Sequence, residues 1–268
     1  MSTIYQKEDE IFNELKDTYP TEVQPLLVKD GLCLSSIRAA NPLLKSSLSM
    51  FGPLAEELYV RDKRKLIFVA KEPNNSEHEV DYRDWIWYEL GKTTAMKKVL
   101  AGILEGLHIT TADYLPRYTD QGLIDKVYEA FSVYPFAFCN MKKLSGGSKT
   151  KMKELWSYAK RDQKILQKQF KEILQGNIIV CFGSSDSERE QDQKNKMINL
   201  VKEIIYPEIK DNFKKINNYC HYDEEADLLL IDSYHFSYPD NGGIKADLLV
   251  NDLLAAFQDF IKKANYKN

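Results

Sequence analysis

Four short apolar runs, separated by longer stretches with helical spacing, constrain the fold of this chain most. A strand that is apolar along its whole length is typical of a parallel sheet that is covered on both faces. Such strands alternating with helices predict an α/β fold, in which a four-stranded parallel sheet forms the middle of a three-layer α/β/α arrangement. The four predicted strands are 66–70, 135–139, 177–182 and 227–231.

The stretches around these strands place apolar residues three and four apart, which predicts amphipathic helices. Thr93 or Thr94 is placed to cap the helix that begins at Ala95. The segment 74–92 is polar and aromatic, and it predicts a long loop at the carboxyl edge of the sheet. We expect a single domain over 1–268, with a helical N-terminal part (1–60) and an α/β core (61–268). The predicted helices are 7–18, 35–60, 95–104, 121–131, 151–174, 188–205 and 246–263.

Composition argues against several classes of protein. The chain contains no run of about 18 apolar residues, so a membrane span is not expected. Its polar N-terminus lacks the apolar segment of a signal peptide, and we therefore expect a monomeric cytoplasmic protein. The 4 cysteines are widely spaced and form no C-x-x-C pair, so they are expected to be buried, reduced thiols. Neither a metal nor another cofactor is expected.

Charge is distributed unevenly along the chain. The net charge of −3 argues against broad affinity for nucleic acid. The segment from Lys142 to Lys171, however, holds ten Lys or Arg and only two acids, Glu154 and Asp162. This basic segment is either the solvated face of a helix or a surface that contacts phosphates.

Polar residues follow each of the four predicted strands. The first strand ends at Glu72-Pro73, and the proline holds Glu72 in an extended conformation at the strand tip. The other three strands end at Asn140, at Gly183-Ser184 and at His235-Phe236-Ser237. Because ligands of open α/β sheets bind at the carboxyl ends of the strands, these residues are candidates for one site.

This ordered set of strand ends resembles the uracil-DNA glycosylase superfamily over roughly residues 60–260. The first motif of its best-known branch is G-Q-D-P-Y-H, which matches Ala70-Lys71-Glu72-Pro73-Asn74. The last motif is H-P-S-P, which matches His235-Phe236-Ser237-Tyr238. Between them, the family has a strand that ends in a base-reading asparagine, matched by Asn140, and a strand that ends in a Gly-Ser turn.

The resemblance implies a DNA glycosylase without metal or cofactor, in which Glu72 and His235 are catalytic. Glu72 would stabilise the cationic sugar and orient a water, and His235 would hydrogen-bond the departing base. Asn140 would read the flipped base, with Trp85 stacking on it and Lys71 beside it. The implied DNA contacts are Ser184, Ser237, Thr94, Gly146, Gly147, Lys142, Lys143 and the aromatic wedge residues Tyr238 and Phe236.

Three departures from the family motifs leave other functions open: Ala70 replaces glycine, Glu72 replaces aspartate and Phe236 replaces proline. The first hypothesis is removal of uracil or a related damaged pyrimidine. The second is removal of a bulkier modified base, as in foreign or phage DNA. A third is a protein that binds DNA or a base without catalysis. A nucleotide-handling α/β hydrolase is a fourth, but the chain lacks the glycine-rich phosphate loop that this class requires after its first strand.

Overall fold

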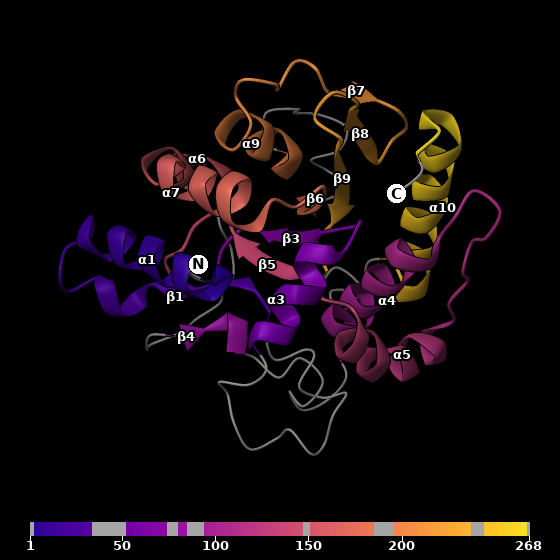
Figure 1. Cartoon of the computed structure of the whole chain (residues 1–268), viewed down its shortest axis with the longest axis horizontal. Coiled ribbons are helices and arrows are strands. Elements are labelled where there is room, and N and C mark those ends of the chain that lie inside the picture. The colour runs from indigo at the N-terminus through magenta and orange to yellow at the C-terminus, as the bar shows by residue number, and fades with distance from the viewer. Residues whose placement is uncertain are drawn as a thin grey trace.

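Strand β3 (Leu66–Ala70) runs through the middle of a seven-stranded mixed sheet in the computed structural model of the chain (Figure 1). Every residue of β3 is buried, as expected for a parallel strand that is covered on both faces. The order across the sheet is β2-β5-β3-β6-β9-β8-β7, and β5, β3, β6 and β9 are parallel. The other strands are β2 (Gly31–Leu32), β5 (Ala137–Asn140), β6 (Ile178–Ser184), β7 (Lys214–Lys215), β8 (Cys220–Asp223) and β9 (Leu228–Tyr234).

Antiparallel strands extend the parallel core at both edges. β2 pairs with β5 at one edge, while β8 and β7 add to β9 at the other. The sheet is therefore larger than the four parallel strands predicted, although the prediction of a mostly parallel α/β sheet is confirmed. A separate two-stranded sheet joins β1 (Val28–Lys29) to β4 (Val80–Asp81), so the N-terminal part is not only helical. The structure describes residues 3–33, 52–73, 80–84, 94–146, 151–184, 196–236 and 244–266.

Helices cover both faces of the sheet (Figure 1). One face is covered by α4 (Ala95–Ile109), α5 (Asp120–Val133) and α10 (Ala246–Ala264), and the predictions of these three helices are confirmed. The other face is covered by α1 (Ile4–Asp17), α3 (Gly52–Arg61), α6 (Met152–Arg161), α7 (Gln163–Gln167), the π-helical segment η5 (Lys168–Leu174) and α9 (Met197–Ile204). Two short 3-10 turns, η1 (Gln24–Leu26) and η4 (Tyr82–Asp84), complete the described elements.

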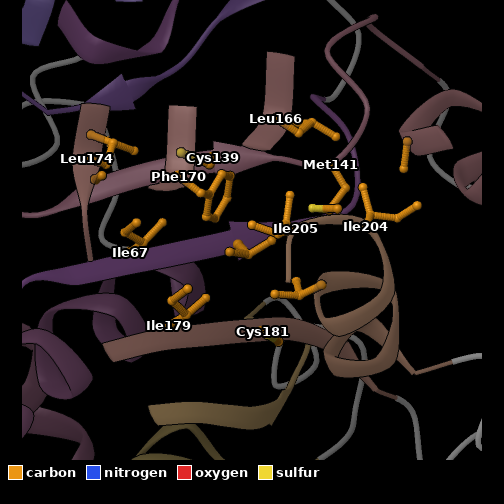
Figure 2. Close-up of a cluster of buried hydrophobic side chains, with 14 of the residues drawn as sticks. Ile67, Cys139, Met141, Leu166, Phe170, Leu174, Ile179, Cys181, Ile204 and Ile205 are labelled. Atoms are coloured by element: carbon orange, nitrogen blue, oxygen red, sulfur yellow. The ribbon is translucent and has the colours of Figure 1, made fainter. Parts of the chain in front are cut away.

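The alternation of side chains along β3 supplies two hydrophobic cores. Ile67 and Val69 point into the core beneath α6, η5 and α9, which Figure 2 shows around Phe170 and Cys181. Phe68 points into the opposite core, beneath α4, α5 and α10. The ends of the parallel strands are thus held between two packed layers.

Three predicted helices match the observed ones only in part. The helix predicted over 151–174 is interrupted at Asp162, whose buried carboxylate accepts a hydrogen bond from the Tyr19 hydroxyl at 2.8 Å. The segment then continues as α7 and as the wider turns of η5. The prediction over 35–60 is met by α3 from Gly52 onward, and the rest of that range lies outside the described residues. The prediction over 188–205 is met by α9 from Met197 onward, and 188–195 lies outside the described residues.

Candidate active site

The parallel strands end at one edge of the sheet, where β6 and β9 extend further than β3 and β5. Ala70 of β3 is opposite Asn140 of β5, and Ser184 of β6 is opposite Tyr234 of β9. The ladder continues past the strands, because the backbone N–H of Lys142 donates to the carbonyl of Lys71 at 3.0 Å. The segment after β3 is therefore fixed to the segment after β5, and this hydrogen bond fixes the position of the Glu72 backbone.

Glu72 forms a nearly buried ion pair at this edge. Its Oε2 accepts a hydrogen bond from Nζ of Lys142 at 2.7 Å, and the two side chains are only 5% and 6% exposed. Gly146 lies against the carboxylate so closely that a Cβ at this position would overlap the Glu72 side chain. The loop is held there because the N–H of Gly146 donates to the carbonyl of Pro73 at 3.1 Å. The carboxylate of Glu72 therefore has one defined position.

Lys142 contacts a second acid and an aromatic ring. Its ammonium donates to Oε1 of Glu154 at 3.1 Å and lies 4.7 Å from the ring centroid of Tyr158, and both residues belong to α6. Burial by itself disfavours the ammonium, but the hydrogen bonds to Glu72 and Glu154 outweigh it and raise the pKa of Lys142. Lys142 was predicted to contact DNA, whereas its described contacts are those of a counter-ion to Glu72.

Lys71 leads from Glu72 toward β6 and β9. Gly183 has a φ of +145°, which favours glycine, and a Cβ there would meet Cε of Lys71 and Cγ of Met197 at 2.7 Å. The Lys71 side chain thus crosses the end of β6 toward His235. Burial, together with the positive charge of Lys71, lowers the pKa of His235 to about 4. His235 is therefore a neutral imidazole at physiological pH.

Phe236 anchors His235 to the core. Its ring is 5.4 Å from that of Phe182 and 6.1 Å from that of Phe138, and it also lies against the imidazole of His235 at 4.2 Å. These contacts are those of a packing residue, and they differ from the predicted role of Phe236 as a wedge inserted into DNA.

Asn140 does not lie on the wall of an open site. It is 1% exposed, and both its backbone N–H and its side-chain amide donate to Oδ2 of Asp30, at 2.8 and 3.0 Å. The side-chain NH₂ group of Asn140 already donates a hydrogen bond inside the protein. The prediction that Asn140 reads the flipped base is therefore wrong for this structure, because its amide instead anchors the end of β5.

Lys143 is also an interior residue, which corrects its prediction as a DNA contact. It is fully buried, and its ammonium pairs with Oδ1 of Asp30 at 2.5 Å and donates to Oε1 of Gln169 at 2.8 Å. A phosphate outside the protein cannot reach this ammonium. Neighbouring lysines thus have different functions: Lys142 meets Glu72, and Lys143 neutralises Asp30.

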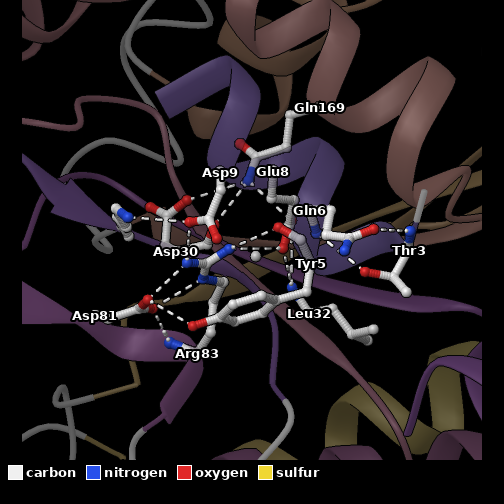
Figure 3. Close-up of polar contacts among 12 residues, drawn as sticks. Thr3, Tyr5, Gln6, Glu8, Asp9, Asp30, Leu32, Asp81, Arg83 and Gln169 are labelled. Carbon is white, nitrogen blue, oxygen red and sulfur yellow. Dashed lines mark hydrogen bonds and ion pairs between the residues drawn. The ribbon is translucent and has the colours of Figure 1, made fainter. Parts of the chain in front are cut away.

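The Asp30 pair belongs to a larger buried polar cluster that connects α1 to the sheet (Figure 3). Glu8 of α1 accepts hydrogen bonds from the N–H of Leu32 and from Nε2 of Gln169, each at 3.3 Å. Arg83 of η4 is fully buried and donates to Asp81 at 2.6 Å and to Asp9 at 2.8 Å. The burial of these charged residues was not predicted from the sequence, because Asp and Arg are usually exposed. Nothing in the local pattern identified their distant partners.

Burial raises the pKa of Glu8 to about 8, against the opposing effect of the Arg83 charge. The stability that protonated Glu8 contributes is fully present below its ordinary pKa of 4.5 and is lost as pH rises through about 8. The free energy of unfolding of Glu8→Gln relative to wild type is therefore expected to rise by a few kcal/mol between pH 5 and 8, at about 1.4 kcal/mol per pH unit. Urea unfolding of both proteins at pH 5 and pH 8 measures this difference in the free energy of unfolding. The control is Glu14→Gln, which changes an exposed acid of the same helix; equal pH dependence in both variants would contradict the prediction.

Four other predicted site residues lie outside the described residues: Trp85, Gly147, Ser237 and Tyr238. Ser184 ends β6, and only its backbone is described. Thr94 caps α4, as predicted, since its hydroxyl accepts a hydrogen bond from the N–H of Lys97 at 3.4 Å. Its described contact is with the helix itself.

The basic segment divides into neutralised and exposed charges. Five of its cations form ion pairs with acids: Lys142, Lys143, Arg161, Lys168 and Lys171. Four others are exposed on or beside α6 and α7: Lys151, Lys153, Lys160 and Lys164. The available positive charge is thus concentrated around α6, which follows the end of β5.

The described residues contain no cluster of three or more His, Cys, Asp or Glu that could hold a metal ion. No described helix is long and apolar enough to cross a membrane. The 4 cysteines are buried, and none forms a disulfide, as the sequence predicted. Comparison of the chain with family models, with curated proteins and with solved structures found no match.

Proposed function

We propose that this protein is a monofunctional DNA glycosylase that hydrolyses the N-glycosidic bond of a flipped nucleotide. The observation that carries the proposal is the fixed carboxylate of Glu72 at the end of β3, with the neutral imidazole of His235 after β9 at the same edge of the sheet. Lys71 brings a positive charge close to His235. The edge thus combines an anion with a neutral donor and a cation.

These groups suit the charges that develop when the bond breaks. The sugar becomes positive, and the carboxylate of Glu72 stabilises it and orients the attacking water. The departing base becomes negative, and neutral His235 donates a hydrogen bond to it while Lys71 contributes its charge. The base leaves the helical stack to reach such a site, because a paired base inside duplex DNA is inaccessible.

The position of Asn140 favours a bulkier modified base over uracil as the substrate. The amide that would read a pyrimidine edge is buried against Asp30. Base recognition then depends on other groups, among which we place Lys71 first because its side chain runs along the edge of the site. Uracil and related damaged pyrimidines are the alternative substrates.

An oligonucleotide panel tests the proposal. Single- and double-stranded DNA containing uracil, damaged pyrimidines and bulky modified pyrimidines is incubated with the protein and then treated with alkali, which cleaves at abasic sites. We expect strand cleavage with at least one modified base and none with unmodified DNA. Specific binding of a modified base without cleavage would instead support the non-catalytic alternative. The absence of both binding and cleavage would overturn the proposal.

The exposed lysines around α6 are expected to contribute DNA affinity. Replacing Lys151, Lys153 and Lys164 with Gln should weaken binding and reduce the salt slope, by about 0.9 for each phosphate that is no longer neutralised. Fluorescence anisotropy over a range of salt concentrations measures both effects. The control replaces Lys168 and Lys171, which already pair with Glu14 and Glu208. An unchanged salt slope in the triple variant would mean that these lysines are only a solvated helix face.

A further inference from the structure

We infer that Lys142 is the positioning residue of Glu72: its ammonium fixes the direction of the carboxylate during the reaction. The inference rests on the proposed function, and it gives Lys142 a role that differs from a contact to DNA.

The geometry around the carboxylate supports this role. One side is held by the ammonium of Lys142 at 2.7 Å, and Gly146 lies against the carboxylate without room for a side chain. The backbones that carry the two partners are joined by the hydrogen bond from Lys142 N–H to the Lys71 carbonyl. A shift of Lys142 would therefore release the carboxylate from its position.

The residues around Lys142 show which of its two ion pairs is the stronger. Within the described part of the chain, the charged or titratable groups that face it are Glu72 after β3 and Glu154 and Tyr158 of α6. Glu154 is 50% exposed, whereas Glu72 is 5% exposed, so water screens the contact with Glu154 more strongly. The pair with Glu72 is thus the stronger electrostatic contact of the two.

The ion pair has a direct consequence for catalysis. A carboxylate that lies away from water is costly as an anion unless a partner neutralises it. The ammonium provides that partner and holds the carboxylate in place for the cationic sugar. Without it, Glu72 loses the hydrogen bond that fixes its orientation.

Lys142→Met tests the inference, with Lys142→Arg as the conservative variant. Lys126→Met is the matched control, since Lys126 of α5 also bridges two glutamates, Glu105 at 2.9 Å and Glu129 at 2.7 Å, on the opposite face of the sheet. We expect Lys142→Met to lower the single-turnover rate about 10²-fold, as misplacement of a reacting group does. DNA affinity should change little, so the loss should appear in the rate at saturating DNA. Lys142→Arg should restore part of the rate.

Different outcomes separate this inference from the proposed function. If wild-type protein cleaves no member of the oligonucleotide panel, the proposed function fails, and the inference fails with it. If wild type cleaves but Lys142→Met matches Lys126→Met in single-turnover rate, only the inference is overturned. Weaker DNA affinity with an unchanged rate at saturating DNA would also overturn it, because Lys142 would then be a DNA contact.

A stability measurement covers the case in which Lys142→Met folds poorly. Melting temperatures are compared for Glu72→Gln, Lys142→Met and the double variant. We expect Lys142→Met to cost less stability in the Glu72→Gln background, where no carboxylate is left unpaired. Fully additive shifts would show that the two charges do not interact, and would overturn the inference independently of activity.

Discussion

Replacing Glu72 with Gln is expected to slow single-turnover cleavage by about 10²–10³-fold, the range found when a preorganised electrostatic group is removed from an active site. The amide keeps the size of the side chain and can still accept a hydrogen bond from Lys142. It loses the negative charge that stabilises the sugar, and this charge matters mainly in the transition state. DNA affinity should therefore change far less than the rate. Rapid-quench measurements with excess protein give the rate, and anisotropy gives the affinity.

His235→Ala is the companion measurement. It should also slow cleavage, because it removes the neutral donor to the departing base. The two losses are not expected to add fully in the double variant, since both groups act on one transition state. A wild-type single-turnover rate in Glu72→Gln would mean that another group is the catalytic carboxylate.

The largest expected effect on stability comes from Lys143→Met. Removing this ammonium leaves Asp30 fully buried with an uncompensated charge, and breaking a buried pair from one side typically costs about 3–5 kcal/mol. Urea unfolding at neutral pH measures the loss. The result also tests whether Lys143 is structural, because a DNA-contacting lysine on the surface would change stability little.

Lys168→Met is the matched control for this prediction. Lys168 belongs to the same basic segment, but its ion pair with Glu14 joins side chains that are 37% and 53% exposed. An exposed pair contributes about 0–1 kcal/mol, so the two variants should differ by several kcal/mol. Similar losses would mean that Lys143 is not held as tightly as its contacts indicate.

The parallel part of the fold was predictable because each central strand carries its own signal. Leu66–Ala70 and Ile178–Ser184 are apolar over most of their length, and both became parallel strands of the sheet. The edge strands carry no such signal. β7 consists of two exposed lysines, and β2 of two residues beside a buried acid. These short strands form because a neighbouring edge is available, which depends on tertiary contacts.

The candidate site was predictable in its position along the chain but not in its pairings. The predicted strand 66–70 is observed as β3, and no helix begins at residues 71–73, which include Glu72. The assignments of Asn140 and Lys143 were wrong because the partner of both, Asp30, lies 110 and 113 residues away in a region expected to be helical. Sequence alone could not distinguish two adjacent lysines, of which one meets Glu72 and the other Asp30.

The buried polar cluster around Glu8 also bears on the order in which the protein folds during synthesis. α1 emerges first and can form by local contacts, but the contact between Glu8 and Gln169 spans 161 residues. This contact can therefore form only after the segment through η5 has left the ribosome. When the helix finally docks at neutral pH, Glu8 takes up a proton from the solvent. Docking of α1 onto η5 is thus coupled to the uptake of a proton.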